Sequence, residues 1–232
     1  MAEIIPAIMP QSIEDLENDL ALVANTVSTV QLDIMDGKFV RPKTWPYQNN
    51  KGTFEEILTE SEGLPFWDKI DFEIDLLVAK PEDSIDNWIA AGASRIIVHV
   101  ESTNNVEGIV NTFKERFAYA PDSKSRDIEL VLSLNIDTPI DSVLPYLEDI
   151  DGVQFMGIAH IGYQGEPFDE RVIDKIREFH NAHPTVIISI DGGVTLDNGP
   201  QLVTVGVKRL VSGSAIYESG NIADTIEMFK SF

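Results

Sequence analysis

The sequence predicts a single (β/α)₈ barrel that extends over residues 1–232. Short β-branched runs alternate with helix-like stretches along the whole chain, a pattern typical of βα units and a parallel sheet. Several of these runs are almost continuously apolar, as expected of strands that are buried on both faces. The length of 232 residues suits one eight-fold repeat, and no Ser/Gly/Pro-rich linker interrupts the alternation.

The expected elements follow this alternation in order along the chain. The predicted strands are Glu3–Ile8, Thr29–Met35, Phe72–Val78, Arg95–Val100, Ile128–Asn135, Gly152–Gly157, Thr185–Ile190 and Arg209–Ser212. The predicted helices lie near 12–25, 53–61, 82–91, 105–117, 140–147, 169–182, 196–204 and 221–231. The longest irregular stretch, from Asp36 to Thr53, follows the second strand, and we expect it to form a lid or a substrate wall.

Composition restricts the possible partners. The formal net charge of −22 and the pI near 4.3 argue against nucleic acid, whose binding needs clustered Lys and Arg. No apolar run approaches a membrane span, and the first residues do not resemble a secretory signal. The absence of cysteine excludes disulfides and thiolate chemistry. We therefore expect a cytoplasmic protein without a nucleic-acid or membrane partner, and a homo-oligomer is left open.

Three predicted strands carry carboxylates at their C-terminal ends, where reactive residues of such barrels lie. Asp33 shares a face of the second strand with Gln31, Asp75 lies near the end of the third strand, and Asp191 follows the seventh. Burying such groups is costly unless a cation or hydrogen bonds meet them. We expect the three to converge at the barrel mouth, where they would raise one another's pKa or bind a cation. For Asp36, hydrogen bonding to loop amides is the simpler role.

Glycines follow the last two predicted strands. Gly192 and Gly193 come after the seventh strand, and Gly213 precedes Ser214 after the eighth. Glycine lets backbone N–H groups approach a ligand closely, and these two loops form the usual phosphate site of such barrels. One Gly-Gly pair is common in turns, whereas two glycine loops on adjacent late strands are more specific. They predict an anion site that needs no Lys or Arg.

These segments resemble the ribulose-phosphate 3-epimerase family in order and spacing over nearly the whole chain. The matching segments are Pro6 to Met9, Val30 to Val40, Asp75 to Val78, Ala90 to Ala93, His99 to Glu101, Leu134-Asn135, Met156 to Phe168, Asp191 to Val194 and Gly213 to Tyr217. No single segment is specific. Together they identify the chain as a member of that superfamily.

The resemblance implies a sugar-phosphate 3-epimerase that acts on a ketose phosphate such as ribulose 5-phosphate. Asp33 and Asp191 match the acid and base that move the proton of carbon three through an enediolate. Met35 and Met156 match methionines that line the reacting carbon. The expected substrate-binding residues are Met35, Met156, Gly162, Gly165, Gly192, Gly193, Gly213 and Ser214.

The chain also departs from the family pattern. Gln31 and Asp75 stand where the resemblance implies two metal-binding histidines, Ala7 replaces a substrate-contacting serine, and Leu77 replaces a methionine. The expected metal ligands are Gln31, Asp33, Asp75 and Asp191. Four oxygen donors suit Mg²⁺ or Mn²⁺ better than Zn²⁺, unless the site has lost its metal. His99 matches a family residue on the fourth strand, where we expect a hydrogen-bonded structural role.

Two other functions stay open, because fold does not determine function. One is an Mg²⁺-dependent aldolase or decarboxylase of the related ribulose-phosphate-binding barrels, whose third strand carries an Asp-x-Lys-x-x-Asp pattern. Asp75 matches its first residue, but Leu77 and Lys80 do not match the others. The second is a non-catalytic barrel that binds a phosphosugar and has lost turnover.

Overall fold

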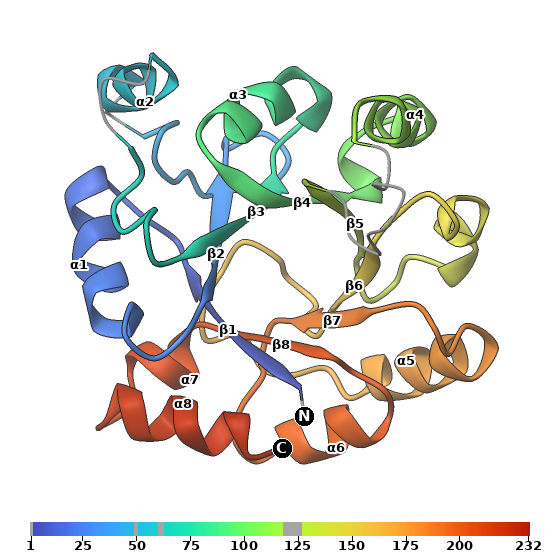
Figure 1. Cartoon of the computed structure of the whole chain (residues 1–232). Coiled ribbons are helices and arrows are strands. Elements are labelled where there is room, and N and C mark those ends of the chain that lie inside the picture. Colours follow the sequence, from blue (N-terminus) through green and yellow to red (C-terminus); the bar gives the residue numbers. More distant parts are fainter. Residues whose placement is uncertain (1, 49–50, 60–62, 118–126) are drawn as a thin grey trace.

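The computed structural model describes residues 2–48, 51–59, 63–117 and 127–232, and in this part of the chain eight parallel strands close into a barrel (Figure 1). The strands are β1 (Glu3–Ile8), β2 (Thr29–Met35), β3 (Asp71–Leu77), β4 (Ala93–His99), β5 (Glu129–Leu134), β6 (Gly152–Met156), β7 (Ile188–Asp191) and β8 (Arg209–Ser212). Each strand pairs with its neighbour in sequence, and β8 closes the barrel against β1. The predicted (β/α)₈ fold class is confirmed.

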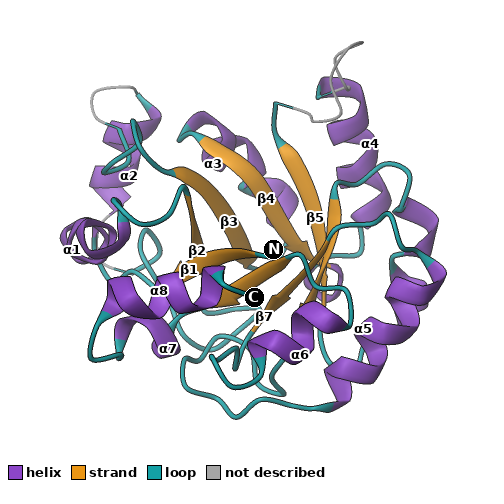
Figure 2. Cartoon of the chain, turned by 60° about the horizontal axis from the view of Figure 1, so that its bottom comes forward, coloured by secondary structure: helices purple, strands orange, loops and turns teal. Residues whose placement is uncertain are grey.

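Helices surround the strands, as the purple ribbons outside the orange ones show (Figure 2). They are α1 (Ile13–Val23), α2 (Lys51–Leu58), α3 (Ile85–Ala90), α4 (Val106–Arg116), α5 (Arg171–Ala182), α6 (Gly199–Thr204), α7 (Ser214–Tyr217) and α8 (Ile222–Lys230). The main apolar core lies between the outward faces of the strands and these helices. Within the described residues, no helix combines the length and apolar character that a membrane crossing needs.

Some predicted elements were wrong in type or extent. The predicted helix at 140–147 consists of two short 3₁₀ turns, Ile140–Ser142 and Leu144–Tyr146. Pro145 explains this, because it lacks an N–H and disfavours helical geometry in the preceding residue. The strand predicted from Thr185 begins only at Ile188, since a turn occupies the residues before it. The predicted helix at 53–61 ends partly outside the described residues, and the short α7 was not predicted.

The inner face of the barrel is polar at its N-terminal end. We define the basal ion cluster as Glu3, Glu73, Arg95, Glu129 and Arg209. The Arg95 guanidinium contacts both Glu73 and Glu129, and Arg209 Nη2 lies 2.9 Å from Glu129 Oε2. Burial raises the pKa of the Glu73 carboxyl, while Arg95 opposes that shift. The lower half of the barrel is thus filled by paired charges.

We expect Arg95→Met to destabilise the protein strongly, because it leaves the buried Glu73 carboxylate without its nearest cation. Breaking a buried ion pair in this way costs about 3–5 kcal/mol, against about 1 kcal/mol or less for an exposed pair. Arg116→Met, which breaks the exposed pair with Asp86, is the matched control. Urea titration measures the free energy of unfolding, and equal losses in the two variants would contradict a stabilising role for the basal cluster.

Candidate functional site

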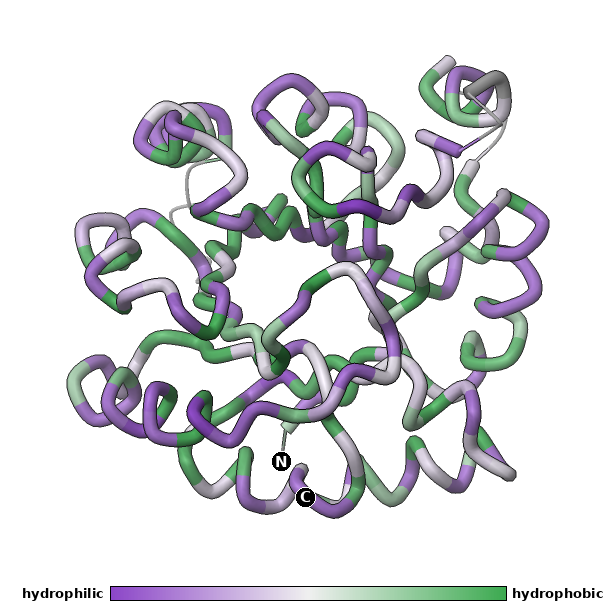
Figure 3. Tube along the Cα trace, turned by 180° about the vertical axis from the view of Figure 1, so that it is seen from behind, coloured by the Kyte–Doolittle hydropathy of each residue, from purple (hydrophilic) through white to green (hydrophobic). Residues whose placement is uncertain are grey.

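A cavity of about 340 Å³ opens at the C-terminal ends of the strands. Figure 3 views this end of the barrel, where a loop crosses the mouth. Nine of the predicted site residues line the cavity: Asp33, Met156, Gly162, Gly165, Asp191, Gly192, Gly193, Gly213 and Ser214. The other three, Gln31, Met35 and Asp75, are buried beside it. The structure therefore gathers the predicted residues at one end of the barrel.

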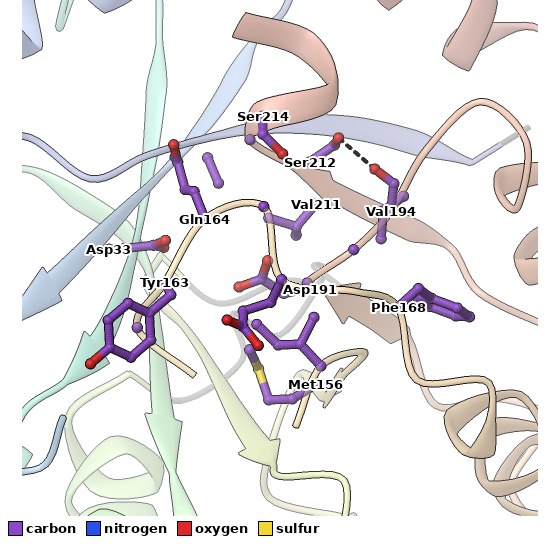
Figure 4. Close-up of a pocket in the computed structure, with 18 of the residues that line it drawn as sticks. Asp33, Met156, Tyr163, Gln164, Phe168, Asp191, Val194, Val211, Ser212 and Ser214 are labelled. Carbon is purple, nitrogen blue, oxygen red and sulfur yellow. Dashed lines mark hydrogen bonds between the residues drawn. The ribbon is translucent and has the colours of Figure 1, made fainter. Parts of the chain in front are cut away.

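Three carboxylates meet beneath this cavity. Asp33 on β2, Asp75 on β3 and Asp191 on β7 each offer an oxygen, and these oxygens lie within 4.8 Å of one another. All three residues are buried. Asp33 and Asp75 are register partners on adjacent strands, whereas Asp191 comes from β7, with β8 and β1 between it and β2. We call them the carboxylate triad, and Figure 4 shows two of its members in the pocket.

The fully buried side chain of Gln31 joins two members of the triad. Its Nε2 donates to Asp33 Oδ1 at 2.7 Å and to Asp191 Oδ2 at 3.0 Å. Its Oε1 has no hydrogen-bond partner among the described residues. An amide placed between two carboxylates satisfies both with its N–H groups, which leaves its oxygen as a spare donor atom for a cation.

Two further buried side chains hold Asp75. His99 Nε2 lies 3.0 Å from Asp75 Oδ1, and Gln154 Nε2 lies 3.3 Å from Asp75 Oδ2. The expectation of a hydrogen-bonded role for His99 agrees with this contact. Gln154 was not singled out from the sequence, although its position two residues before Met156 on β6 places both side chains on the inner face.

The electrostatics of the site raise the pKa of two members of the triad, Asp33 and Asp191. Burial, followed by repulsion from Asp191 and Asp75, raises the pKa of Asp33 well above its usual range, although the Gln31 hydrogen bond opposes the shift. Burial and then the Asp75 carboxylate raise the pKa of Asp191 to about 7. Burial lowers the pKa of His99, but the neighbouring carboxylates outweigh it and the net shift is upward.

The triad could bind a metal ion. Three buried carboxylates face one another with a single imidazole as the nearest cationic partner, so negative charge exceeds positive charge at this point. A divalent cation would relieve this repulsion, and the unpartnered Gln31 oxygen lies beside the same carboxylates. The donors present thus fit a cation that prefers oxygen ligands.

The two glycine loops form another wall of the cavity. Gly193 has φ +67°, and a β-carbon there would lie 2.8 Å from the Phe168 Cα atom, so only glycine fits. Asn198 Nδ2 donates to the Gly193 carbonyl at 2.9 Å, which fixes the turn. Among the hydrogen bonds of the described residues, none is donated by the backbone N–H of Gly193 or Ser214. These N–H groups remain available to an anion.

Loops after β2 and β6 pack together above the triad. Met35, Val40 and Leu77 form a small apolar cluster with the partly buried Ile161. Gly162 has φ +89°, and a β-carbon there would lie 3.1 Å from the Val40 side chain. This packing shields one side of the triad from water.

The long loop after β2 contributes none of its described residues to the lining of the cavity. Val40 of this loop packs on Met35 and Leu77, and the expected role as a lid or substrate wall stays a prediction. The loop also braces the strand end: Thr44 Oγ1 accepts from Met35 N at 2.9 Å and donates to the Asp33 carbonyl at 2.9 Å. Asp36 accepts from Lys38 N and Ala79 N, the loop-bonding role expected for it.

The sequence did not single out several cavity residues on the loop after β6. Tyr163, Gln164, Glu166 and Phe168 all line the cavity. All four lie in the segment from Met156 to Phe168 that resembles a loop of the family, but only Met156, Gly162 and Gly165 were assigned to substrate binding from it. The resemblance did not indicate which side chains point inward, because that depends on how the loop folds back over the barrel.

The fold and the site define a (β/α)₈ barrel with acids and a glycine-lined cavity at its C-terminal mouth. Similar folds include KGPDC from Streptococcus mutans, with a TM-score of 0.68 at 15% identity, covering 100% of this chain and 96% of that one. The 3-hexulose-6-phosphate synthase from Salmonella typhimurium has a TM-score of 0.67 at 12% identity, covering 99% and 97%. At these identities the likeness concerns the fold.

Sequence comparison identifies the family, which the likeness of folds does not. The profile of the ribulose-phosphate 3-epimerase family matches residues 3–217, and the chain belongs to this family. Among its relatives, the ribulose-phosphate 3-epimerase of Eremothecium gossypii is 24% identical and that of Schizosaccharomyces pombe 25% identical. The alignments cover 98% and 97% of this chain and 91% of each relative.

The raised pKa of Asp191 predicts a pH-dependent stability in the presence of a chelator. The folded state keeps a proton that the unfolded chain releases above its ordinary pKa of 3.8. The contribution of this group is therefore complete below about pH 4 and is lost as the pH rises through 7, at about 1.4 kcal/mol for each unit of pKa difference. Asp191→Asn cannot ionise, so its melting temperature should exceed that of the wild type by more at pH 8 than at pH 5.

The exposed Asp141→Asn is the control for this measurement. Thermal melts at both pH values are compared for the three proteins. A constant difference between Asp191→Asn and the wild type would show that Asp191 is already ionised at pH 5.

Proposed function

We propose that this protein is a sugar-phosphate 3-epimerase-like enzyme that acts on a ketose phosphate such as ribulose 5-phosphate. The observation that carries the proposal is the placement of Asp33 and Asp191 on one cavity that also has the two glycine loops in its wall. Membership of the ribulose-phosphate 3-epimerase family and the names of its relatives support a phosphosugar substrate.

The glycine loops are proposed to bind the phosphate. The backbone N–H groups of Gly193 and Ser214 are available, and the rigid turn at Asn198 keeps the first of them in place. A phosphate held at these loops would orient the sugar so that its reacting carbon lies over the carboxylate triad. Holding a reactant in this way removes much of the entropic part of the barrier.

Asp33 and Asp191 are proposed as the acid–base pair. The ionised member removes the proton of carbon three, and the protonated member returns a proton to the opposite face of the enediolate. This requires one proton shared between two carboxyls near neutral pH, which suits the pKa of about 7 for Asp191 and the raised pKa of Asp33. Gln31 donates to both carboxylates and stabilises whichever one is ionised.

A divalent metal is proposed at the triad, held by Gln31, Asp33, Asp75 and Asp191. When bound, it would supply positive charge that stabilises the oxygens of the enediolate. The all-oxygen donor set favours Mg²⁺ or Mn²⁺ over Zn²⁺, which prefers nitrogen and sulfur ligands in closed tetrahedral sites.

We expect calorimetry to detect Mg²⁺ and Mn²⁺ binding, with Zn²⁺ bound less tightly than either. Asp75→Asn should weaken Mn²⁺ binding more than about tenfold, because a neutral amide replaces one of three charged donors. Asp141→Asn, which changes the net charge equally at an exposed position, should leave the affinity unchanged. Tight Zn²⁺ binding without any response to Mg²⁺ or Mn²⁺ would refute the preference.

The catalytic proposal predicts exchange at carbon three. With ribulose 5-phosphate in D₂O, the wild type should incorporate deuterium at that carbon when the preferred metal is present. Asp191→Asn should reduce turnover by about 10²–10⁴-fold, the usual contribution of a placed acid or base, while phosphate binding persists. Mass spectrometry of the recovered sugar measures the exchange. If the sugar takes up no deuterium with the wild type and Mg²⁺, Mn²⁺ or Zn²⁺, the proposed epimerase reaction is refuted.

One observation favours a second candidate, a barrel that binds a phosphosugar without turnover. Gln31 and Asp75 stand where the resemblance implies histidines, and Gln31 uses its N–H groups on both members of the proposed acid–base pair. Binding of ribulose 5-phosphate without deuterium exchange would support this candidate. The aldolase or decarboxylase alternative is disfavoured, because the buried Leu77 occupies the position of the lysine in that pattern.

A further inference from the structure

We propose that Gln164 is a specificity-determining residue whose side-chain amide donates hydrogen bonds to the anionic group of the substrate. This inference rests on the proposed function, since it concerns the same cavity and adds a side-chain donor to the backbone N–H groups of the glycine loops. Gln164 lies on the loop after β6 and lines the cavity together with Gly193, Gly213 and Ser214 (Figure 4).

The Gln164 side chain spans from its own loop to the loop after β8. Its Nε2 lies 3.0 Å from the point that a β-carbon on Gly213 would occupy, and the Ala7 carbonyl oxygen lies 3.3 Å from the same point. A side chain at position 213 would therefore have to displace the flexible Gln164 amide. The absence of a side chain at Gly213 leaves room for Gln164 Nε2 beside Ser214.

The amide of Gln164 is also uncommitted. Neither its nitrogen nor its oxygen takes part in a hydrogen bond among the described residues. A free side-chain amide within reach of the glycine loops has two N–H groups to offer to an oxyanion. Its donor role does not depend on protonation, so it should persist across the physiological pH range.

The charges around the cavity make such a neutral donor important. The described residues that line the cavity include the acids Asp33, Glu166 and Asp191 and no lysine or arginine. Glu166 has His160 Nδ1 at 3.3 Å on the same loop. In this acidic cavity an anion must be bound by N–H groups. Each additional N–H donor increases the preference for a phosphate group over a hydroxyl group.

The test compares four proteins: the wild type, Gln164→Ala, Gln164→Glu and the control Gln201→Glu. Gln201 is exposed on α6 and is not among the residues lining the cavity, so its variant carries the same added charge elsewhere. Calorimetry measures the binding of inorganic phosphate, ribulose 5-phosphate and unphosphorylated ribulose. Circular dichroism checks that each variant folds. If Gln164→Glu does not fold, the comparison of Gln164→Ala with the wild type provides the test.

We expect Gln164→Ala to bind phosphate and ribulose 5-phosphate about tenfold more weakly, the usual effect of losing one hydrogen bond to a charged group. Gln164→Glu should lose more, since it places a carboxylate beside the anion. Binding of unphosphorylated ribulose should not change, and Gln201→Glu should behave as the wild type.

The failures of the two proposals are distinguishable. If the wild type binds both phosphate compounds and the Gln164 variants bind them equally well, the role of Gln164 is overturned while the proposed function stands. An equal loss for unphosphorylated ribulose would likewise overturn it, since the residue would then act on the sugar or on the loop. A wild type that binds neither phosphate compound removes the proposed function, and the role of Gln164 with it.

Discussion

Charge inside a closed barrel must be neutralised within the barrel, and this constraint governs both halves of the interior. The basal ion cluster meets it with two arginines, whose guanidinium groups reach the carboxylates at the N-terminal end. At the C-terminal end, the carboxylate triad has no arginine or lysine among the partners of its described side chains. The lower layer therefore sets two arginines against its three glutamates. Among the described residues, the upper layer sets one imidazole against three carboxylates and carries the larger excess of negative charge.

That excess leaves the upper layer three ways to reach neutrality: a proton, neutral N–H donors, or a bound cation. The structure shows the second in the contacts of Gln31 and Gln154 with the triad. The raised pKa of Asp191 reflects the first. A site that can be neutralised either by a proton or by a cation can release or accept a proton at small free-energy cost. An acid–base pair needs this property.

Much of the site followed from period and position in the sequence. Asp33, Asp75 and Asp191 could be placed at one end of the barrel because parallel strands present their C-terminal ends to the same face. The contact of Gln154 with Asp75 could not be predicted in this way, because it depends on the stagger of the strands, which brings a side chain of β6 to one of β3 across the barrel. Gln164 likewise depends on the path of a loop, for which periodicity offers no signal.

Asp191 and the first glycine loop of the cavity belong to a single backbone segment. Asp191 ends β7, and the glycine loop begins at the next residue, so the proposed acid and the proposed phosphate cradle share one turn. The Asp191 carbonyl accepts from Gly157 N at 2.6 Å, which ties the loop after β6 to the same point. A displacement of the glycine loop would therefore move the carboxylate as well. The proposed binding of an anion and the position of the proposed acid would thus be coupled by covalent geometry, with no need for a separate device to align them.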